Sequence, residues 1–265
     1  MRVLTLNLWG MGGDWPARRA VLAAGLRELR PDVVAFQEAV KTDSVDAVGD
    51  IVAPEFRVAH QTRGLLGDGN CAAIASRWPL GHVHEVDLQL TPRTADFPAT
   101  TQLAEIDAPI GPLLFVNHLP SWKPQLERER ELQAVAAARR VEEIVAGDPR
   151  HVVLAGDLDA TPEASSIRFL RGLQSLEGMS VCYRDAWEAI HPGEPGHTFT
   201  PRNPLVLEET DVRVELSRRI DHILVRCDER GPTLRVVDCA LAFDEPSDGV
   251  WASDHFGLVA DLEQP

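Results

Sequence analysis

Lysine is almost missing from this chain of 265 residues. Lys41 and Lys123 are the only two, and arginine supplies the rest of the basic charge. Acidic residues outnumber basic ones by 41 to 26, so the formal net charge is −15. This balance opposes non-specific binding to DNA or RNA, which depends on neutralising phosphates, but it leaves room for a local basic rim. Arginine suits bidentate phosphate contacts. A GC-rich genome produces the same bias, and we favour that explanation.

The chain also lacks any apolar run near the roughly 20 residues that a transmembrane helix needs. The apolar start, residues 1–9, is short and has no small-residue cleavage site, so we expect a first strand rather than a signal peptide. The four cysteines form no Cys-x-x-Cys pair, which argues against a zinc site and favours reduced thiols. We therefore expect a cytoplasmic protein without a membrane span, and nothing in the sequence indicates a protein partner.

What remains is typical of a globular protein, with 44% hydrophobic and 25% charged residues. We find no repeat, low-complexity segment or convincing linker, and expect one domain over residues 1–265. Many strands and few helices indicate an α/β protein with two sheets and the helices outside. Apolar patterns predict strands at residues 2–8, 32–37, 57–59, 71–76, 82–88, 101–106, 113–117, 152–155, 220–225, 234–241 and 257–262. They predict helices at residues 15–29, 44–51, 124–145 and 163–172, and a less regular region at 173–218.

Two carboxylates stand at the end of the apolar run at residues 151–154. Asp157 and Asp159 are two residues apart, so in extended chain they point to the same side. Gly156 allows another segment to approach the backbone closely, and Thr161-Pro162 can cap and start a helix. Unpaired buried charge is costly, so a bound metal or a proton-transfer role would explain the pair. A loop with two solvated carboxylates explains it equally well.

The same arrangement recurs along the chain, because polar residues flank the apolar part of several other expected strands. If these strand ends converge, the site holds five carboxylates, which repel one another strongly without a cation. Carboxylate and amide oxygens suit Mg²⁺ or Mn²⁺, and two histidines can contact phosphate or relay protons. The residues concerned are Asn7, Gln37, Glu38, Asn117, His118, Asp157, Asp159, Asp221, Asp254 and His255.

Each of these residues also has a structural interpretation. Asn7 or Glu38 alone can be a solvated strand end, and His118 a satisfied, partly buried histidine. Asp221 can form an ion pair with Arg219, and residues 253–255 can be a turn. The order and spacing of the whole set carry more weight than any one member.

That ordered set resembles the endonuclease/exonuclease/phosphatase superfamily, the deoxyribonuclease-I-like metal-dependent phosphoesterases. The resemblance spans essentially the whole chain, and it implies a four-layer α/β sandwich of two mostly antiparallel β-sheets packed face to face with helices outside. Single motifs are weak, whereas six in the right order are specific. They are Leu-Thr-Leu-Asn at 4–7, Phe-Gln-Glu at 36–38, Val-Asn-His-Leu at 116–119, Gly-Asp-Leu-Asp-Ala at 156–160, Arg-Ile-Asp-His-Ile-Leu at 219–224 and Ser-Asp-His at 253–255. Residues 70–80 also look like the central strand-and-turn segment of that family.

Carried over residue by residue, the resemblance implies a role for each member of the set. Glu38 is the main metal ligand, with Asn7 beside it and Asp254 completing the metal environment. Asp157 orients and deprotonates the attacking water or binds a second cation. Asp221 pairs with His255 and holds it toward the phosphate, and His118 donates to a non-bridging oxygen. The implied chemistry is in-line attack of water on phosphorus.

The chain departs from the family pattern at Asp159, where most relatives have Asn. An Asn can donate a hydrogen bond to the nucleophile or to a phosphate oxygen, whereas an ionised Asp only accepts. Asp159 therefore either binds a metal or shares a proton with Asp157, and we favour metal binding.

The substrate is less defined, since fold does not settle it. We expect a phosphate-ester substrate, with nucleic acid one possibility, and a Mg²⁺- or Mn²⁺-dependent phosphodiesterase or nuclease. The alternatives are a phosphomonoesterase acting on a small phosphorylated metabolite and a catalytically silent phosphate-binding module. The segment at 197–204 lines the substrate cleft through Arg202 and Asn203, or is a structural connector. Trp9 and Trp122 either stack on a base or ring of the substrate or pack in the core.

Overall fold

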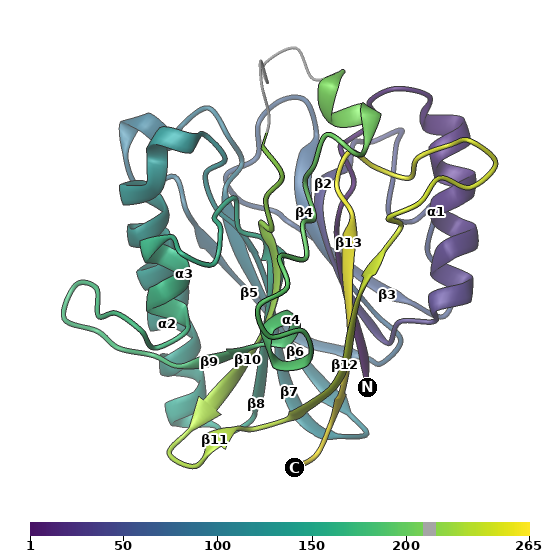
Figure 1. Ribbon diagram of the computed structural model, residues 1–265. Helices are drawn as coiled ribbons and strands as arrows, with labels where there is room; N and C mark the ends of the chain where they lie inside the picture. The colour runs from purple at the N-terminus through teal and green to yellow at the C-terminus, as the bar shows by residue number, and fades with distance from the viewer. Residues whose placement is uncertain (209–215) are drawn as a thin grey trace.

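A computed structural model describes residues 1–208 and 216–265. Within these residues the strands form two sheets that pack face to face, with the helices outside them (Figure 1). The first sheet has six strands in the order β12 (Arg235–Ala242), β13 (Gly257–Glu263), β1 (Arg2–Asn7), β2 (Val33–Val40), β4 (Asn70–Ser76) and β3 (Arg57–His60). The second runs β11 (Gly231–Pro232), β10 (Asp221–Asp228), β8 (His151–Asp157), β7 (Gly111–Leu119), β6 (Thr100–Ala108) and β5 (Leu80–Asp87), and β9 (Tyr183–Asp185) pairs with β10.

Three apolar clusters separate the layers. Val33 and Ala35 of β2 pack against Phe115 of β7 between the sheets, whereas Val34 and Phe36 pack on the opposite face of β2. This is the alternation that strand geometry imposes. Helix α1 (Trp15–Leu29) covers the outer face of the first sheet, and α2 (Glu127–Gly147) and α3 (Ser165–Leu170) cover the outer face of the second (Figure 1). The expected four-layer α/β sandwich is confirmed.

Each sheet contains one parallel pair of strands, and a long helix joins its members. Helix α1 connects β1 to β2, and α2 connects β7 to β8. The carboxyl ends of the four strands therefore lie at one end of the sandwich, which Figure 1 shows at the top. These are the ends at which the sequence carries Asn7, Glu38, His118 and Asp157.

The helix expected at residues 44–51 is wrong, because the chain there forms turns. Thr42 accepts hydrogen bonds from the amides of Ser44 and Val45, and Asp46 Oδ1 accepts one from Gly49 N, 2.8 Å away. Short polar side chains that bond the nearby backbone compete with helix formation, and Gly49 weakens a helix further.

The helix expected at 163–172 is present but shorter, as α3. Thr161-Pro162 does not start it, since Ala164 is its N-cap residue. The less regular region at 173–218 holds β9, the short helix α4 (Ala186–Ile190) and the 3₁₀ turn η3 (Pro204–Leu207); its residues 209–215 lie outside the described part of the chain. Two further 3₁₀ turns, η1 (Pro92–Thr94) and η2 (Pro124–Leu126), stand before α2. No helix in the described residues has the length and apolar character that a bilayer crossing needs.

Candidate active site

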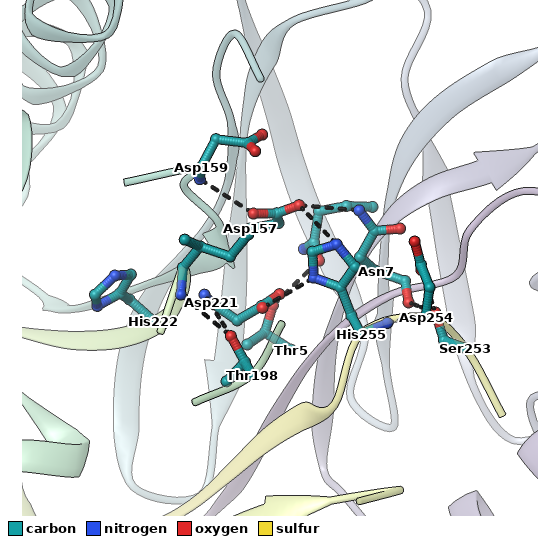
Figure 2. A network of polar contacts seen from close by, with 12 residues as sticks. Thr5, Asn7, Asp157, Asp159, Thr198, Asp221, His222, Ser253, Asp254 and His255 are labelled. Atoms are coloured by element: carbon teal, nitrogen blue, oxygen red, sulfur yellow. Dashed lines mark hydrogen bonds and ion pairs between the residues drawn. The ribbon is translucent and has the colours of Figure 1, made fainter. Parts of the chain in front are cut away.

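The side-chain amide of Asn7 joins the two sheets at the carboxyl ends of their strands (Figure 2). Asn7 Nδ2 donates to Glu38 Oε1 on β2, 3.0 Å away, and to Asp157 Oδ2 on β8, 2.9 Å away. Asn7 Oδ1 accepts from the backbone amide of Trp9 at 2.8 Å, which fixes the orientation of the amide. Asn7, Glu38 and Asp157, which are distant in sequence, thus meet at one point.

Glu38 reaches this point because β2 contains a bulge. The ladder between β2 and β4 pairs Phe36 with Ala73 and then Ala39 with Cys71, so Gln37 and Glu38 together face Ala72. Glu38 has a φ of +49°, an unusual backbone conformation for a residue that is not glycine. The extra residue brings the carboxylate to the Asn7 side of the sheet.

Asp157 and Asp159 lie on the same segment, but they are held differently. Asp157 is buried, and its Oδ1 accepts from the backbone amide of Asp159 at 3.1 Å. Asp159 is half-buried and has a φ of +49°. Gly156 precedes them because β7 passes very close there: a Cβ at Gly156 would lie 2.1 Å from the carbonyl oxygen of His118. The close approach expected at Gly156 is therefore confirmed.

His255 and Asp221 form a buried pair in this site. His255 Nδ1 lies 3.0 Å from Asp221 Oδ2, and His255 Nε2 lies 3.7 Å from Asp157 Oδ2 (Figure 2). Thr198 supports the pair, because its Oγ1 accepts from the backbone amide of Asp221 at 3.2 Å and its carbonyl oxygen accepts from Phe256 N at 2.7 Å. Arg219 is not the partner of Asp221, since it forms its ion pair with Asp185 at 2.8 Å.

Asp254 stands on the loop before β13. Ser253 Oγ donates to the carbonyl oxygen of Asn7 at 2.7 Å and lies 3.2 Å from Asp254 Oδ1, which ties this loop to the end of β1. Asn203 holds the loop from the other side, donating from Nδ2 to the carbonyl oxygens of Ser253 and Asp254 at 2.7 and 3.1 Å. Asn203 is fully buried, and its side chain thus acts on the backbone that carries Asp254.

Burial and the negative charge of neighbouring carboxylates raise the pKa values of Glu38, Asp157 and Asp159. Burial, with the neighbouring charge of Asp254, raises the pKa of Glu38 to about 7. Burial raises that of Asp157 to about 6, with Asp221 contributing. Burial and Asp157 raise the pKa of Asp159 well above its usual range. A divalent cation among these oxygens would reverse the effect. Glu38 and Asp254 offer carboxylate oxygens, the ligand type that Mg²⁺ and Mn²⁺ prefer, and Asn7 Oδ1, which accepts one hydrogen bond from Trp9 N, has a second lone pair.

A second group of possible ligands consists of Asp157, Asp221 and His255, whose nearest atoms all lie within 4.8 Å of one another. Burial alone would lower the pKa of His255, but the charges of Asp221, Asp157 and Asp254 outweigh it and raise the pKa well above the usual range. A protonated imidazole donates hydrogen bonds and does not bind metal. Such a trio can move protons or contact phosphate. Among the residues that the structure describes, Asp221 Oδ1 is buried and has no hydrogen-bond partner.

His118 is buried next to the site, in surroundings that favour the neutral ring. Its Nδ1 lies 2.8 Å from Thr101 Oγ1, and burial lowers its pKa to about 3. If the threonine hydroxyl donates to Nδ1, the proton of the ring is on Nε2 and can be donated. The described residues provide no hydrogen bond between His118 and the carboxylates.

The structure also gives the surroundings of three other side chains singled out in the sequence. Arg202 is exposed and lies beside Asp244 and Glu245. Trp9 packs over Gly12 and under the Arg18 guanidinium, 4.8 Å from its ring centroid. Trp122 is half-buried, with Lys123 Nζ 5.7 Å from its ring centroid.

Sequence reasoning missed Thr198, Ser253 and Arg18 as supports of the site. Arg18 is buried on α1 and donates to the carbonyl oxygens of Leu8, Gly12 and Ala252, so it joins the loop after β1 to the loop before β13. No local signal marks such a residue. The tripeptide at 253–255 was identified, but the part that Ser253 plays depends on a partner almost the whole chain away.

Several solved structures share this fold, and one of them contains bound DNA. D. rerio TDP2 complexed with a single-strand DNA product matches with a TM-score of 0.77 and 20% identity, over 100% of this chain and 99% of that one. TDP2 from C. elegans matches with a TM-score of 0.77 and 20% identity, over 99% of this chain and 74% of that one. Bacteroides thetaiotaomicron mannosyl-6-phosphatase matches with a TM-score of 0.73 and 18% identity, over 99% of both.

A search of the curated proteins finds no significant match. The model of the Endonuclease/Exonuclease/phosphatase family matches residues 4–255, which include every strand-end motif described above. Together with the two-sheet sandwich, this match means that the chain belongs to the endonuclease/exonuclease/phosphatase family.

Proposed function

We propose that this protein is a Mg²⁺- or Mn²⁺-dependent phosphodiester hydrolase. The observation that carries the proposal is the convergence of Asn7, Glu38 and Asp157 on one point, with the pair of Asp221 and His255 beside them. Members of the family are typically hydrolases of phosphoester bonds, and the full set of strand-end residues is present here.

Glu38, Asn7 and Asp254 would hold the cation. When bound, it would neutralise negative charge that develops on the phosphate oxygens during the reaction. Asp159 adds a further carboxylate next to Asp157, and we propose that it also contacts a cation.

The protein's own groups supply the proton transfers. Asp157 accepts a proton from the water that attacks phosphorus in line with the leaving group, and its hydrogen bonds from Asn7 Nδ2 and the backbone amide of Asp159 hold the carboxylate in place. His255, charged through the neighbouring carboxylates, donates to a phosphate oxygen. His118 donates a hydrogen bond from Nε2 to another phosphate oxygen. The bond from phosphorus to the leaving oxygen breaks as the bond to water forms.

A phosphomonoester of a small metabolite is the second candidate substrate. The net charge of −15 favours it, because a strongly acidic protein repels a polyanion more than it repels a small anion. Among the structural neighbours, one was solved with single-strand DNA and another is named a mannosyl-6-phosphatase, so the fold accommodates both kinds of substrate.

A substrate screen tests the proposal. We expect hydrolysis of a bis-aryl phosphodiester that requires Mg²⁺ or Mn²⁺ and stops with EDTA. An aryl phosphomonoester and plasmid DNA are measured in parallel. Faster turnover of the monoester would favour the second candidate. Binding of phosphate without turnover of any substrate would identify a silent phosphate-binding module and would contradict the proposal.

A further inference from the structure

A chain of buried side chains connects the two sheets just below the site. Asn117 of β7 donates from Nδ2 to the carbonyl oxygens of Phe36 and Ala73, 2.9 and 3.0 Å away in the other sheet. Gln37 Nε2 donates to Asn117 Oδ1 at 2.8 Å, and Thr5 Oγ1 donates to Gln37 Oε1 at 3.3 Å. Backbone carbonyl oxygens can only accept hydrogen bonds. The two bonds that Asn117 Nδ2 donates to them therefore fix which atom is the donor in the other bonds of this network. Asn117 and Gln37 are both fully buried.

The two carbonyl groups that Asn117 contacts mark the edge of the bulge in β2. Phe36 and Ala73 form the last regular pair before the break, and Gln37 and Glu38 follow it. Asn117 therefore supplies a donor to each strand at the point where the ladder is interrupted. Such a donor stabilises the bulge, since buried carbonyl groups at a break are costly when they lack partners.

The bulge decides which way Glu38 points. Along β2, Val34 and Phe36 pack on the outer face, under α1, whereas Val33 and Ala35 pack between the sheets. Regular alternation would place residue 38 on the outer face with Phe36. Instead Glu38 contacts Asn7, which also contacts Asp157 of the opposite sheet, and Ala39 occupies the outer face.

We propose that Asn117, together with Gln37, is a positioning residue for Glu38. Its hydrogen bonds from the opposite sheet stabilise the β2 bulge and so fix the direction of the Glu38 carboxylate. The effect of Asn117 on cation binding rests on the proposed function, in which Glu38 is the main ligand. The effect of Asn117 on the backbone of β2 does not depend on that function.

Gln102 offers a matched control. It lies on β6 directly opposite Asn117 in the strand register, and it is also fully buried. Among the described residues neither of its side-chain amide atoms has a hydrogen-bond partner. Its replacement by Ala therefore removes an amide from the same layer of the core without removing a bond to β2.

The test compares Asn117→Ala, Gln102→Ala and Glu38→Gln with the parent protein. Amide hydrogen exchange on metal-free protein reports on residues 37–40, and calorimetric titration with Mn²⁺ reports binding directly. We expect faster exchange at 37–40 and Mn²⁺ affinity lower by about 10- to 100-fold in Asn117→Ala, a typical effect of losing support behind a ligand. In Gln102→Ala both quantities should stay within about twofold of the parent.

Several outcomes overturn the proposal. It fails if Asn117→Ala leaves exchange at 37–40 unchanged, or if Gln102→Ala alters both quantities as much. It also fails if Glu38→Gln abolishes Mn²⁺ binding while Asn117→Ala leaves the affinity intact. If exchange rises in Asn117→Ala but neither variant affects Mn²⁺ binding, the ligand role of Glu38 is wrong and the positioning role stands. Should Asn117→Ala not fold, Gln37→Met removes the adjoining bonds and is judged by the same readouts.

Discussion

The imidazole of His255 and the carboxylate of Asp221 are hydrogen bonded at 3.0 Å, and both residues are buried. Asp221 begins β10 of one sheet, and His255 precedes β13 of the other. The bond therefore fixes the ring across the gap between the sheets. Burial alone would lower the pKa of the ring, but the charges of Asp221, Asp157 and Asp254 raise it well above the usual range.

Asp221→Asn should lower kcat by about 100-fold or more, because the ring loses its charged partner while an amide of the same shape remains. Steady-state rates with a bis-aryl phosphodiester and saturating Mg²⁺ measure the effect. Circular dichroism serves as the folding control. A kcat within twofold of the parent value would mean that the pair is structural.

Asp159→Asn tests the position at which the chain departs from its family. The variant removes one of two like charges, so the metal-free protein should melt at a higher temperature than the parent. The rise in Tm on adding Mg²⁺ should be smaller, and half-maximal rate should need more Mg²⁺. Scanning calorimetry with EDTA and with Mg²⁺ decides this. Identical Tm values, metal requirement and rate would show that Asp159 does not bind a cation.

Asp185 provides a pH test that does not involve the residues proposed to bind metal. It is buried beside Arg219 and His222. Burial would raise its pKa, but the hydrogen bonds and charges of these partners outweigh it and hold the pKa well below the usual range. A carboxylate with a depressed pKa stabilises the fold above its unfolded pKa of about 3.9, and this contribution is lost as pH falls toward the folded pKa.

Asp185→Asn should therefore cost about 3 kcal/mol of unfolding free energy at pH 7, because Arg219 is left buried without its counterion. The difference from the parent should shrink as pH falls below 4. An Asn still caps α4, so the variant isolates the charge. Urea unfolding at several pH values measures the effect, with Glu163→Gln as an exposed control. A pH-independent difference would contradict the interpretation.

Gly156→Ala tests the close passage of β7 over β8. The new methyl group would lie 2.1 Å from the carbonyl oxygen of His118, and a backbone atom cannot easily move. We expect a loss of about 3 kcal/mol in urea unfolding, at the upper end of overpacking costs. Gly147→Ala, at the end of α2 with no neighbour within 4 Å, should instead be neutral or stabilising by about 0.5 kcal/mol. Equal effects of the two changes would contradict the packing described here.

The fold and much of the site could be predicted from sequence because both depend on local patterns. Apolar strands end in polar side chains, and two parallel pairs of strands place four of those ends together. Asn7, His118 and Asp157 stand at three of those ends. Asp221 and His255 stand instead at or before the start of β10 and β13, which run antiparallel to β8 and β1 and so begin at the same end of the sandwich. The roles assigned to these residues stay predictions until variants are measured.

What the sequence could not supply depends on partners far away in the chain. The helix expected at 44–51 is wrong because Thr42 and Asp46 bond the nearby backbone instead. No local sequence pattern predicts the bulge at Glu38, since its stabilising donor, Asn117, is 81 residues from Phe36. The segment at 197–204 was expected either to line the cleft or to be a structural connector, and the buried amide of Asn203 bonds the loop that carries Asp254.

The most direct test of the central claim is metal-dependent turnover in Glu38→Ala. Glu38 is the carboxylate that Asn7 and the β2 bulge direct into the site, and we propose it as the main ligand of the cation. With a bis-aryl phosphodiester and excess Mg²⁺, the account predicts nearly complete loss of hydrolysis in a folded variant. Normal turnover under those conditions would contradict it.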